Sequence, residues 1–383
     1  MNLMADVENK NQPPIEAPQD FYTWFGSEQG QKASFAQMRE RCDKGRDAAE
    51  NLSCSVSVFA RMFEAKAANQ LPEYYLSIKR RHARAIDKSP ELKVLFSMFG
   101  SESISILTKS PDFSIKKAEH RELLAIHPYV SDFYIDEQLL PYIDVKAANG
   151  VSSRFILDTG ASITRINYET ARKMNIKLLV DSHYAYSTFY GESGLPAQFG
   201  ILESLSVGGS EFKNILIFVS DRENILGLDL ISKLGRIKIT NSTLEVNSES
   251  SAQCNSRIVY ARMDMNQRLT IAALLDDAVT LAIIDTGNLD YLTSSLPGAE
   301  ENKVKNGLGE IFIDAPLDQI FRGVLDLPNN SMVINYKYHP SFTIPQSLLF
   351  GEYVSSILLG WRAFNDFEMS LDMDSGRSCF NKT

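Results

Sequence analysis

The tripeptide Asp-Thr-Gly occurs twice in this chain, and each copy directly follows an apolar run that is typical of a buried β-strand. The first stands in "FILDTGAS", residues 155–162, and the second in "LAIIDTGN", residues 281–288. A carboxylate at the end of a buried strand costs free energy unless it is hydrogen-bonded, shared or used. Two such corners in one chain therefore favour a fold in which Asp158 and Asp285 meet, rather than two unrelated strand-to-turn corners.

The sequence around the two corners repeats one order of predicted elements. Before each corner, two β-rich runs are joined by a turn, an Asn-Gly pair at 149–150 in the first copy and an Asp-Asp pair at 276–277 in the second. Later in each copy an apolar run ends in glycine, as Ile-Leu-Gly and then as Leu-Leu-Gly. The chain therefore contains two copies of one β unit, a first copy over residues 128–247 and a second copy over 257–383.

Two carboxyls held side by side do not both ionise easily, so one keeps a proton while the other stays charged. Such a pair offers a general base that deprotonates water and a general acid that protonates a carbonyl oxygen. The residues expected to support it, through close backbone approach and hydrogen bonds between the copies, are Thr159, Gly160, Thr286 and Gly287. A third carboxylate, Asp229 in "ILGLDL", is expected to cap the helix that follows rather than to do chemistry.

The two corners resemble those of the pepsin and retropepsin clan of aspartic proteases, and "FILDTGASITRINYETARKMNI" and "ILGLDLISKLG" are similar to bacterial retropepsin-like domains. The resemblance implies a mainly β, bilobal acid-protease fold, with two β-barrel-like lobes and a cleft between them. It implies an aspartic endopeptidase that cleaves a polypeptide substrate with water activated between Asp158 and Asp285, without cofactor or metal. Retropepsins supply the two corners from two chains, whereas this chain carries both, as pepsins do.

The resemblance also implies a flap, a hairpin that closes over the substrate and excludes water. "STFYGESGLP" lies where the family places it, and Tyr190-Gly191 is similar to the Tyr-Gly pair of pepsin flaps. The alternative is an ordinary hairpin tyrosine. The matching stretch of the second copy, near 310–319, has no Tyr-Gly pair, so we expect one flap.

The second corner departs from the family at Asn288, where a small or hydroxyl residue is usual and the first copy has Ala161. We expect the Asn288 amide to lie near Asp285 and to lower the pKa of that carboxyl, which would make Asp285 the ionised member and Asp158 the protonated one. The alternative is that Asn288 turns away from the carboxyl and braces the turn.

The first third of the chain lies outside the resemblance. Its apolar residues recur three and four apart, which predicts three to five helices, and Ser89 before Pro90 is a helix-start signal. We interpret the basic segment "SIKRRHARAIDK" as one solvated helix face, with inhibition of an acidic cleft as the alternative. The predicted organisation is a disordered tail over 1–19, a helical domain over 20–125, and protease lobes over 128–247 and 257–383.

The four cysteines have no zinc-ligand spacing with histidines, and we interpret them as small buried or surface thiols. One pairing stands out, because Cys254 opens the last predicted domain and Cys379 closes it. A bridge there would join the two ends of that domain.

Composition excludes some classes of function. A net charge of −9 with a pI near 5.2 argues against a general nucleic-acid binder, and no apolar run reaches the ~18 residues of a membrane span. No secretory signal is visible, which indicates a cytoplasmic protein as numbered, or a periplasmic or secreted one if a signal was removed. The rival functions are a catalytically silent binding module whose helices recruit a protein partner, and a hydrolase of non-protein amides or esters.

Overall fold

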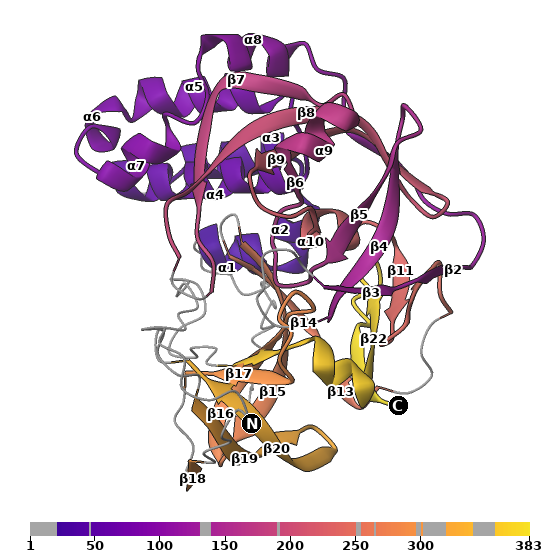
Figure 1. Ribbon diagram of the computed structural model, residues 1–383. Coiled ribbons are helices and arrows are strands. Elements are labelled where there is room, and N and C mark those ends of the chain that lie inside the picture. Colours follow the sequence, from indigo (N-terminus) through magenta and orange to yellow (C-terminus); the bar gives the residue numbers. More distant parts are fainter. Residues whose placement is uncertain are drawn as a thin grey trace, which may run out of the picture. The chain divides into compact units, whose positions relative to one another are not determined.

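The computed structural model describes residues 21–45, 47–130, 139–189, 192–249, 254–263, 266–295, 300–301, 319–339 and 357–383 (Figure 1). Helices come first along the chain and three β-sheets follow, which confirms the predicted mainly β class with a helical N-terminal region. The tail predicted over 1–19 lies outside the described residues. No helix within the described ranges is long and apolar enough to cross a membrane.

The chain divides into two compact units, Met1–Val58 and Phe59–Thr383, so the division falls inside the long helix α4 and not near residue 125. In the first unit, Ser34 and Gln37 form a capping box at the start of α3, which satisfies N–H groups at that helix end. The helices of this unit are α1 (Phe21–Gly26), α2 (Glu28–Lys32), α3 (Phe35–Asp43) and the start of α4 (Ala48–Glu64).

The thiol interpretation of the cysteines is wrong, because all four are paired. Cys42 and Cys54 form a disulfide within the first unit, and Cys254 and Cys379 form the second disulfide. The suggested pairing of Cys254 with Cys379 is therefore confirmed. Sequence spacing could not decide this, since pairing depends on which Cβ atoms the fold brings together.

Four further helices belong to the second unit, and the structure confirms a helix start at Ser89, whose side chain accepts a hydrogen bond from the Leu92 N–H. These helices are α5 (Leu71–Arg81), α6 (Ala83–Ile86), α7 (Pro90–Leu95) and α8 (Ser101–Thr108). Beyond them, β1 (Ser114–Lys116) and β2 (Glu122–Ala125) are strands that pair with the β-sheets. The helical part of the chain therefore ends at Thr108, before the predicted boundary at 125.

The first copy, together with the preceding strand β1, forms a nine-stranded sheet with the order β1-β9-β6-β10-β5-β4-β8-β7, and β3 pairs with β4 at its side. The Asn-Gly turn is present, with Gly150 at φ +84°, where glycine is favoured. The elements are β3 (His127–Val130), β4 (Leu139–Ala147), β5 (Ser152–Leu157), β6 (Arg165–Asn167), α9 (Tyr168–Lys173), β7 (Lys177–Tyr186), β8 (Leu195–Val207), β9 (Ser210–Ser220), β10 (Ile225–Leu226) and α10 (Leu228–Ile231).

The second copy forms an eight-stranded sheet with the order β14-β15-β16-β21-β17-β20-β19-β18. Asp276 and Asp277 both have positive φ, as a two-residue hairpin turn requires. The elements are β14 (Val259–Met263), β15 (Asn266–Leu275), β16 (Ala278–Ile284), β17 (Leu292–Ser294), β18 (Glu300–Glu301), β19 (Gln319–Leu327), β20 (Asn330–Tyr338), β21 (Ile357–Leu359) and the 3-10 helix η1 (Trp361–Asn365). The predicted stretch near 310–319 lies mostly outside the described residues.

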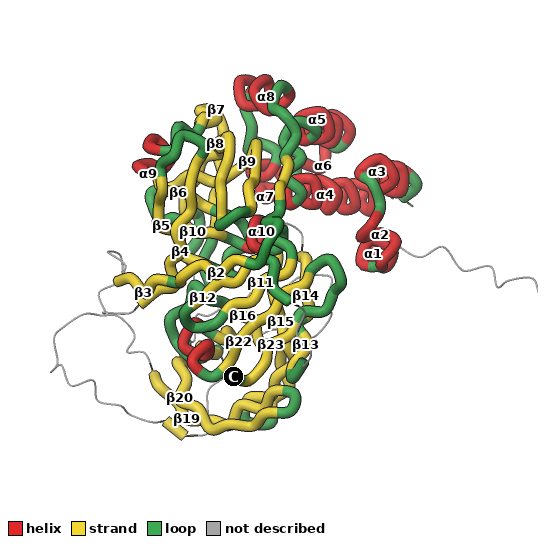
Figure 2. The backbone as a smooth tube through the Cα atoms, turned by 90° about the vertical axis from the view of Figure 1, so that its right-hand side faces the viewer, coloured by secondary structure: helices red, strands yellow, loops and turns green. Residues whose placement is uncertain are grey.

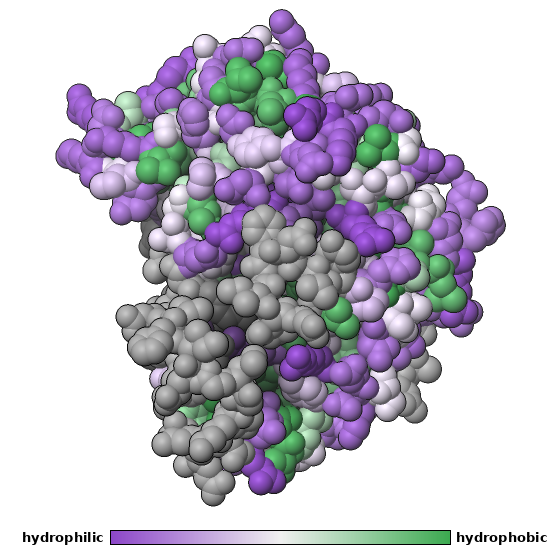
Figure 3. All heavy atoms as spheres, viewed as in Figure 1, coloured by the Kyte–Doolittle hydropathy of each residue, from purple (hydrophilic) through white to green (hydrophobic). Residues whose placement is uncertain are grey.

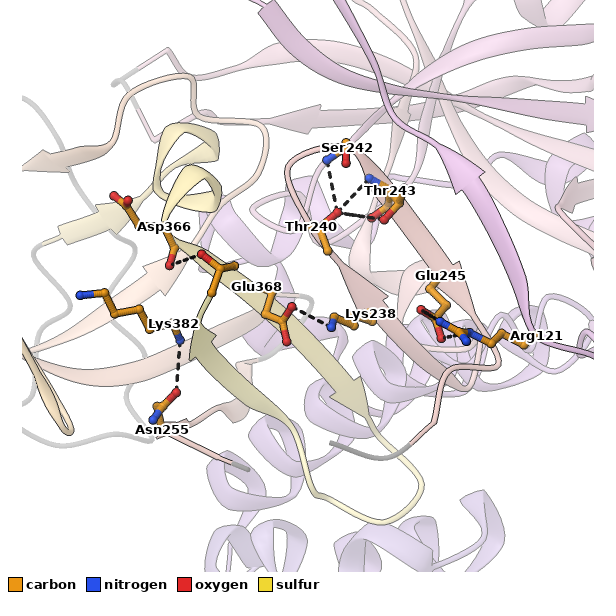
Figure 4. A network of polar contacts seen from close by, with 11 residues as sticks. Arg121, Lys238, Thr240, Ser242, Thr243, Glu245, Asn255, Asp366, Glu368 and Lys382 are labelled. Atoms are coloured by element: carbon orange, nitrogen blue, oxygen red, sulfur yellow. Dashed lines mark hydrogen bonds and ion pairs between the residues drawn. The ribbon is translucent and has the colours of Figure 1, made fainter. Parts of the chain in front are cut away.

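A six-stranded sheet joins the two copies, with the order β13-β23-β22-β11-β12-β2. Its centre is the antiparallel pair of β11 and β22, where Ile237 lies opposite Leu371 and the Lys238–Glu368 ion pair spans 2.7 Å (Figure 4). Each copy contributes a C-terminal hairpin. The strands of the six-stranded sheet are β11 (Arg236–Ile239), β12 (Thr243–Val246), β13 (Ser256–Arg257), β22 (Phe367–Asp372) and β23 (Cys379–Lys382), with β2 at one edge.

Buried apolar side chains from all three sheets form one continuous core. On the face shown in Figure 3, hydrophobic residues appear as small separate groups among hydrophilic ones. This is the expected result when the apolar faces of helices and strands are turned inward.

The Cys254–Cys379 disulfide closes a loop with a sequence separation of 125, because β13 and β23 are neighbours in the six-stranded sheet. We expect a Cys254→Ala/Cys379→Ala variant to lose about 2–5 kcal/mol of unfolding free energy, measured by denaturant titration. The matched control removes Cys42 and Cys54, whose separation is 12, and should lose less. Equal midpoints for the wild type and the first variant would contradict this prediction.

Candidate active site

Each of the two aspartates is the first residue after a buried strand, and the glycine-ending run of its own copy holds its backbone. Asp158 follows β5, and its N–H donates to the carbonyl of Leu226 in β10 at 3.1 Å. Asp285 follows β16, and its N–H donates to the carbonyl of Leu359 in β21 at 2.8 Å. Because β10 and β21 run parallel to β5 and β16, the two copies present their aspartates on equivalent corners.

The two corners lie so close together that each aspartate occupies the space above the glycine of the other corner. A Cβ on Gly287 would lie 2.5 Å from Cγ of Asp158, and a Cβ on Gly160 would overlap the carboxyl of Asp285. Neither glycine can therefore carry a side chain. The structure brings together the two aspartates and the two glycines that the sequence analysis selected.

The two threonines connect the corners by reciprocal hydrogen bonds, and both are fully buried. Thr159 Oγ1 donates to the carbonyl of Ile284 at 2.8 Å and accepts from the Thr286 N–H at 3.1 Å. Thr286 Oγ1 donates to the carbonyl of Leu157 at 2.5 Å and accepts from the Thr159 N–H at 2.9 Å. Each hydroxyl thus satisfies one donor and one acceptor of the opposite copy, which holds the aspartates at a fixed separation.

The two carboxyls receive different numbers of backbone hydrogen bonds. Asp158 Oδ1 accepts from the N–H groups of Gly160 at 2.8 Å and Ala161 at 2.9 Å. Asp285 Oδ1 accepts from the Gly287 N–H at 3.0 Å, while the Asn288 N–H donates to the backbone carbonyl of Asp285. Donors stabilise the charged form of a carboxyl, so the first corner favours ionisation more than the second does.

The pKa values of both carboxyls are raised, first of all because burial penalises the charged form. The carboxyls also share a hydrogen bond, which lowers the pKa of Asp158 and raises that of Asp285. The charge of Asp158 contributes further, and the pKa of Asp285 lies well above its usual value. These directions and the additional backbone donor at the first corner favour the negative charge on Asp158 and the proton on Asp285.

This order of ionisation is the reverse of the one expected from Asn288. The Asn288 amide donates to Thr293 Oγ1 at 3.0 Å, and its oxygen accepts from the Asp290 N–H at 3.1 Å. The side chain thus braces the turn after the corner, as the alternative interpretation proposed. It is not among the groups that lower the pKa of Asp285.

Two arginines, which the sequence analysis did not select, act electrostatically on the carboxyls. The charge of Arg165, whose guanidinium lies 4.8 Å from the ring centre of Tyr186, lowers the pKa of Asp158. The charge of Arg268 lowers the pKa of Asp285. Each copy thus supplies one cation, and Arg268 interacts electrostatically with Asp158 as well as with Asp285.

Arg268 is only 7% exposed and connects β15 to the first corner. Its Nη1 donates to Ser162 Oγ at 2.5 Å and to the carbonyl of Gly160 at 3.3 Å, and its guanidinium lies 4.8 Å from the ring centre of Phe189. Burial lowers the pKa of Arg268 to about 10, and the charges of Asp285 and Asp158 oppose that change. The sequence indicates only weakly that Arg268 belongs to the site, because it is a single charged residue near the start of a mostly apolar strand.

The predicted capping role of Asp229 is wrong. The N-cap of α10 is Gly227, and no side chain caps that helix. Asp229 is 1% exposed, and its Oδ1 accepts from the N–H of Thr164 at 2.8 Å and from its Oγ1 at 2.6 Å. The carboxylate therefore binds the loop that follows Asp158 instead of its own helix.

The flap residues Tyr190 and Gly191 lie outside the described residues. The strands on either side are described, and Tyr186 at the end of β7 pairs with Leu195 at the start of β8. The Thr188 N–H donates to the carbonyl of Glu192 at 2.9 Å. Within the described ranges, no group of three or more histidine, cysteine, aspartate or glutamate side chains could hold a metal ion.

The reciprocal threonine bonds make a direct prediction. Thr159→Val keeps the shape of the side chain but leaves the buried Thr286 N–H without its acceptor, and we expect a loss of about 1–3 kcal/mol of unfolding free energy. Denaturant titration measures the loss. The control is Thr270→Val, a buried position whose hydroxyl makes one bond, to the Val259 carbonyl. A Thr159 variant no less stable than the control would refute the role given to this bond.

Part of the chain is similar to known aspartyl proteases. Residues 145–233 match the family model described as "gag-polyprotein putative aspartyl protease". A search of curated proteins found no match. Among solved structures, the chain is similar to a retropepsin-like aspartic protease from Rickettsia conorii, with 22% identity and a TM-score of 0.24 over 36% of this chain and 94% of the other. The resemblance seen in the sequence is therefore confirmed for residues 145–233, which are similar to retropepsin-like aspartyl proteases.

Proposed function

We propose that this protein is a single-chain aspartic endopeptidase of pepsin-like, bilobal organisation that cleaves peptide bonds with Asp158 and Asp285. One observation carries the proposal: two carboxyls, one from each copy, meet so closely that each lies over the glycine of the opposite corner, with Asp285 buried and Asp158 half-buried. Structural ion pairs are built from opposite charges, whereas two carboxyls forced together are a source of acid–base chemistry. The family match over residues 145–233 supports the same reaction class.

The asymmetry of the pair gives each carboxyl a role. The ionised Asp158 acts as general base and takes a proton from a water molecule that attacks the substrate carbonyl carbon. The protonated Asp285 acts as general acid and donates its proton to the carbonyl oxygen. The resulting tetrahedral intermediate collapses when Asp158 passes the proton it took from water to the amide nitrogen and the C–N bond breaks. Asp285 takes back a proton from a hydroxyl of the intermediate, which leaves a carboxylic acid product and returns the pair to its starting state. No covalent enzyme intermediate is needed, because water is the nucleophile.

Substrate closure is assigned to the tip of the β7–β8 hairpin. Its strands pair as far as Tyr186 and Leu195, which leaves a short connection that includes Tyr190 and Gly191. Phe189 at this tip packs against the buried pair Ile283 and Leu358. A hairpin tip that bends over the carboxyls would exclude water from the bond being cleaved.

The rival proposal is a protease-fold binding module that does not turn over a substrate. The departure of Asn288 from the family pattern is the sequence feature that favours it, and in the structure that side chain braces the turn after the corner. Hydrolysis of a diverse peptide library across pH, with and without pepstatin, separates the two proposals. Release of peptides that pepstatin suppresses favours the endopeptidase. Pepstatin binding without cleavage favours the binding module, and cleavage of esters or non-protein amides alone favours the third class.

The carboxyl pair predicts the effect of replacing either aspartate with the uncharged residue asparagine. Asp158→Asn and Asp285→Asn should each lower kcat for peptide hydrolysis by about 10³-fold or more, because each removes one half of a shared acid–base pair. Circular dichroism should show an unchanged fold. The control is Asp144→Asn, an exposed strand residue whose replacement should leave kcat unchanged. Near-wild-type turnover in either dyad variant would contradict the assignment.

The two arginines predict separable effects on the pH–rate profile. Activity requires Asp158 ionised and Asp285 protonated, so the acidic limb follows the first proton lost by the pair and the alkaline limb follows the second. Arg165 lowers the pKa of Asp158, so Arg165→Met should move the acidic limb to higher pH. Arg268 lowers the pKa of Asp285, so Arg268→Met should move the alkaline limb to higher pH.

The charge-conserving variant Arg268→Lys is the matched control for this experiment. It should leave the alkaline limb closer to its wild-type position than Arg268→Met does, since the ammonium retains the positive charge. If neither limb of the pH–rate profile moves in Arg165→Met or Arg268→Met, these two cations do not set the ionisation of the carboxyl pair.

A further inference from the structure

Lys66 is a completely buried charged residue. It lies in the helical stretch of the second unit, residues 59–108, which runs from the end of α4 to the end of α8. It follows α4 at φ +61°, has an exposed fraction of 0%, and its Nζ donates to the carbonyl of Leu216 in β9 at 2.9 Å. The same Nζ forms an ion pair with Oδ2 of Asp229, which is equally buried. A lone buried ammonium or carboxylate would cost several kcal/mol, so each of these charges depends on the other.

A continuous series of hydrogen bonds runs from this ion pair to the first corner. Asp229 Oδ1 accepts from Thr164, at 2.8 Å from the N–H and 2.6 Å from Oγ1. Thr164 Oγ1 in turn accepts from the Gly227 N–H at 3.0 Å. The next residue, Leu228, donates its N–H to the carbonyl of Ala161 at 2.8 Å. Both ends of the loop after Asp158 are thus held by the segment that Asp229 belongs to.

That segment approaches the loop at backbone distance, which leaves it little freedom to shift. A Cβ on Gly227 would lie 2.7 Å from the carbonyl carbon of Ile163. The residue before it, Leu226, accepts the N–H of Asp158. A small displacement of the segment would therefore be transmitted to the aspartate.

Apolar and polar contacts hold the helical stretch beside the nine-stranded sheet. Phe63 at the end of α4 packs against Phe199 and Phe218, with ring centres 5.4 and 6.0 Å apart. The N-terminus of α8 is capped from β7, where Asp181 accepts from the N–H groups of Glu102 at 2.9 Å and Ser103 at 2.8 Å. In both Figure 1 and Figure 2, α8 lies beside β7.

We propose that Lys66 is a positioning residue, which neutralises Asp229 from the helical stretch and so holds the loop that carries Asp158. The inference rests on the proposed function for its catalytic consequence. It makes residues 59–108 a resident part of the first corner and not a removable inhibitory segment. The basic residues of α5, which the sequence analysis considered for an inhibitory role, are not needed for this contact.

The test uses the full chain and a double-mutant cycle. Lys66→Met keeps the length of the side chain and its unbranched Cβ at the positive φ but leaves the carboxylate of Asp229 buried without its cation. Adding Asp229→Asn removes that charge and keeps an oxygen that can accept from Thr164. The control is Lys233→Met, because Lys233 Nζ donates to two backbone carbonyls nearby, of Glu64 and Asp229, at 3.0 and 2.9 Å.

Three measurements are made on each variant. Lys66→Met should lower the folded-to-unfolded equilibrium constant by about 100-fold or more, and the double variant should recover most of this loss. In the folded variant, amide hydrogen exchange over residues 158–164 should rise more than exchange over the corresponding loop 285–291. kcat should fall about tenfold or more with KM little changed, since positioning affects the transition state. Lys233→Met, which removes hydrogen bonds but leaves no buried charge unpaired, should change local exchange and kcat less than Lys66→Met does.

Either of two results would overturn the proposal. One is a Lys66→Met variant with wild-type exchange over 158–164, and the other is a double variant no more stable than the single variant, which excludes coupling. If Lys66→Met does not fold, rescue of folding by Asp229→Asn supports the ion pair, and failure of rescue rejects it. Because exchange needs no substrate, an inactive wild type with the expected exchange pattern would refute the proposed function and leave the positioning role intact.

Discussion

The close approach of the Asp158 and Asp285 carboxyls, each over the glycine of the opposite corner, is the constraint on which the rest of the structure depends. Two acidic groups in a buried site repel one another once both ionise, so the pair persists only where the surrounding fold forces it. The reciprocal threonine bonds hold the two corners together, and the two glycines leave room for each carboxyl above the opposite corner. The same confinement raises both pKa values and keeps one proton within the pair.

The two corners meet because a third sheet joins the copies. The antiparallel pairing of β11 with β22 connects the C-terminal hairpin of the first copy to that of the second. The Cys254–Cys379 disulfide fixes the edge of this sheet, next to β13. The interface that positions the aspartates is thus a set of main-chain ladders within one chain, and its strength does not depend on protein concentration, unlike an interface between two chains.

The two copies have the same order of elements but give their aspartates different surroundings. Asp158 accepts two backbone N–H groups and Asp285 accepts one, which favours charge on the first and a proton on the second. The buried Lys66 supports the segment behind the first corner, and Arg268 reaches across from the second copy to the same loop. In the proposed mechanism, these differences, rather than the repeated motif, make Asp158 the base and Asp285 the acid.

The sequence by itself determined the β repeat, the two Asp-Thr-Gly corners and the mainly β class with helices before it. These follow from short-range patterns, such as apolar strands that end in Asp-Thr-Gly and turns with residues that tolerate positive φ. Only the tertiary structure decided the cysteine pairing, the shared sheet, the turn-bracing role of Asn288 and the partner of Asp229. Each of those depends on which groups from distant parts of the chain become neighbours. A buried charge such as Lys66 or Asp229 has no local pattern, because its free energy is set by a partner more than a hundred residues away.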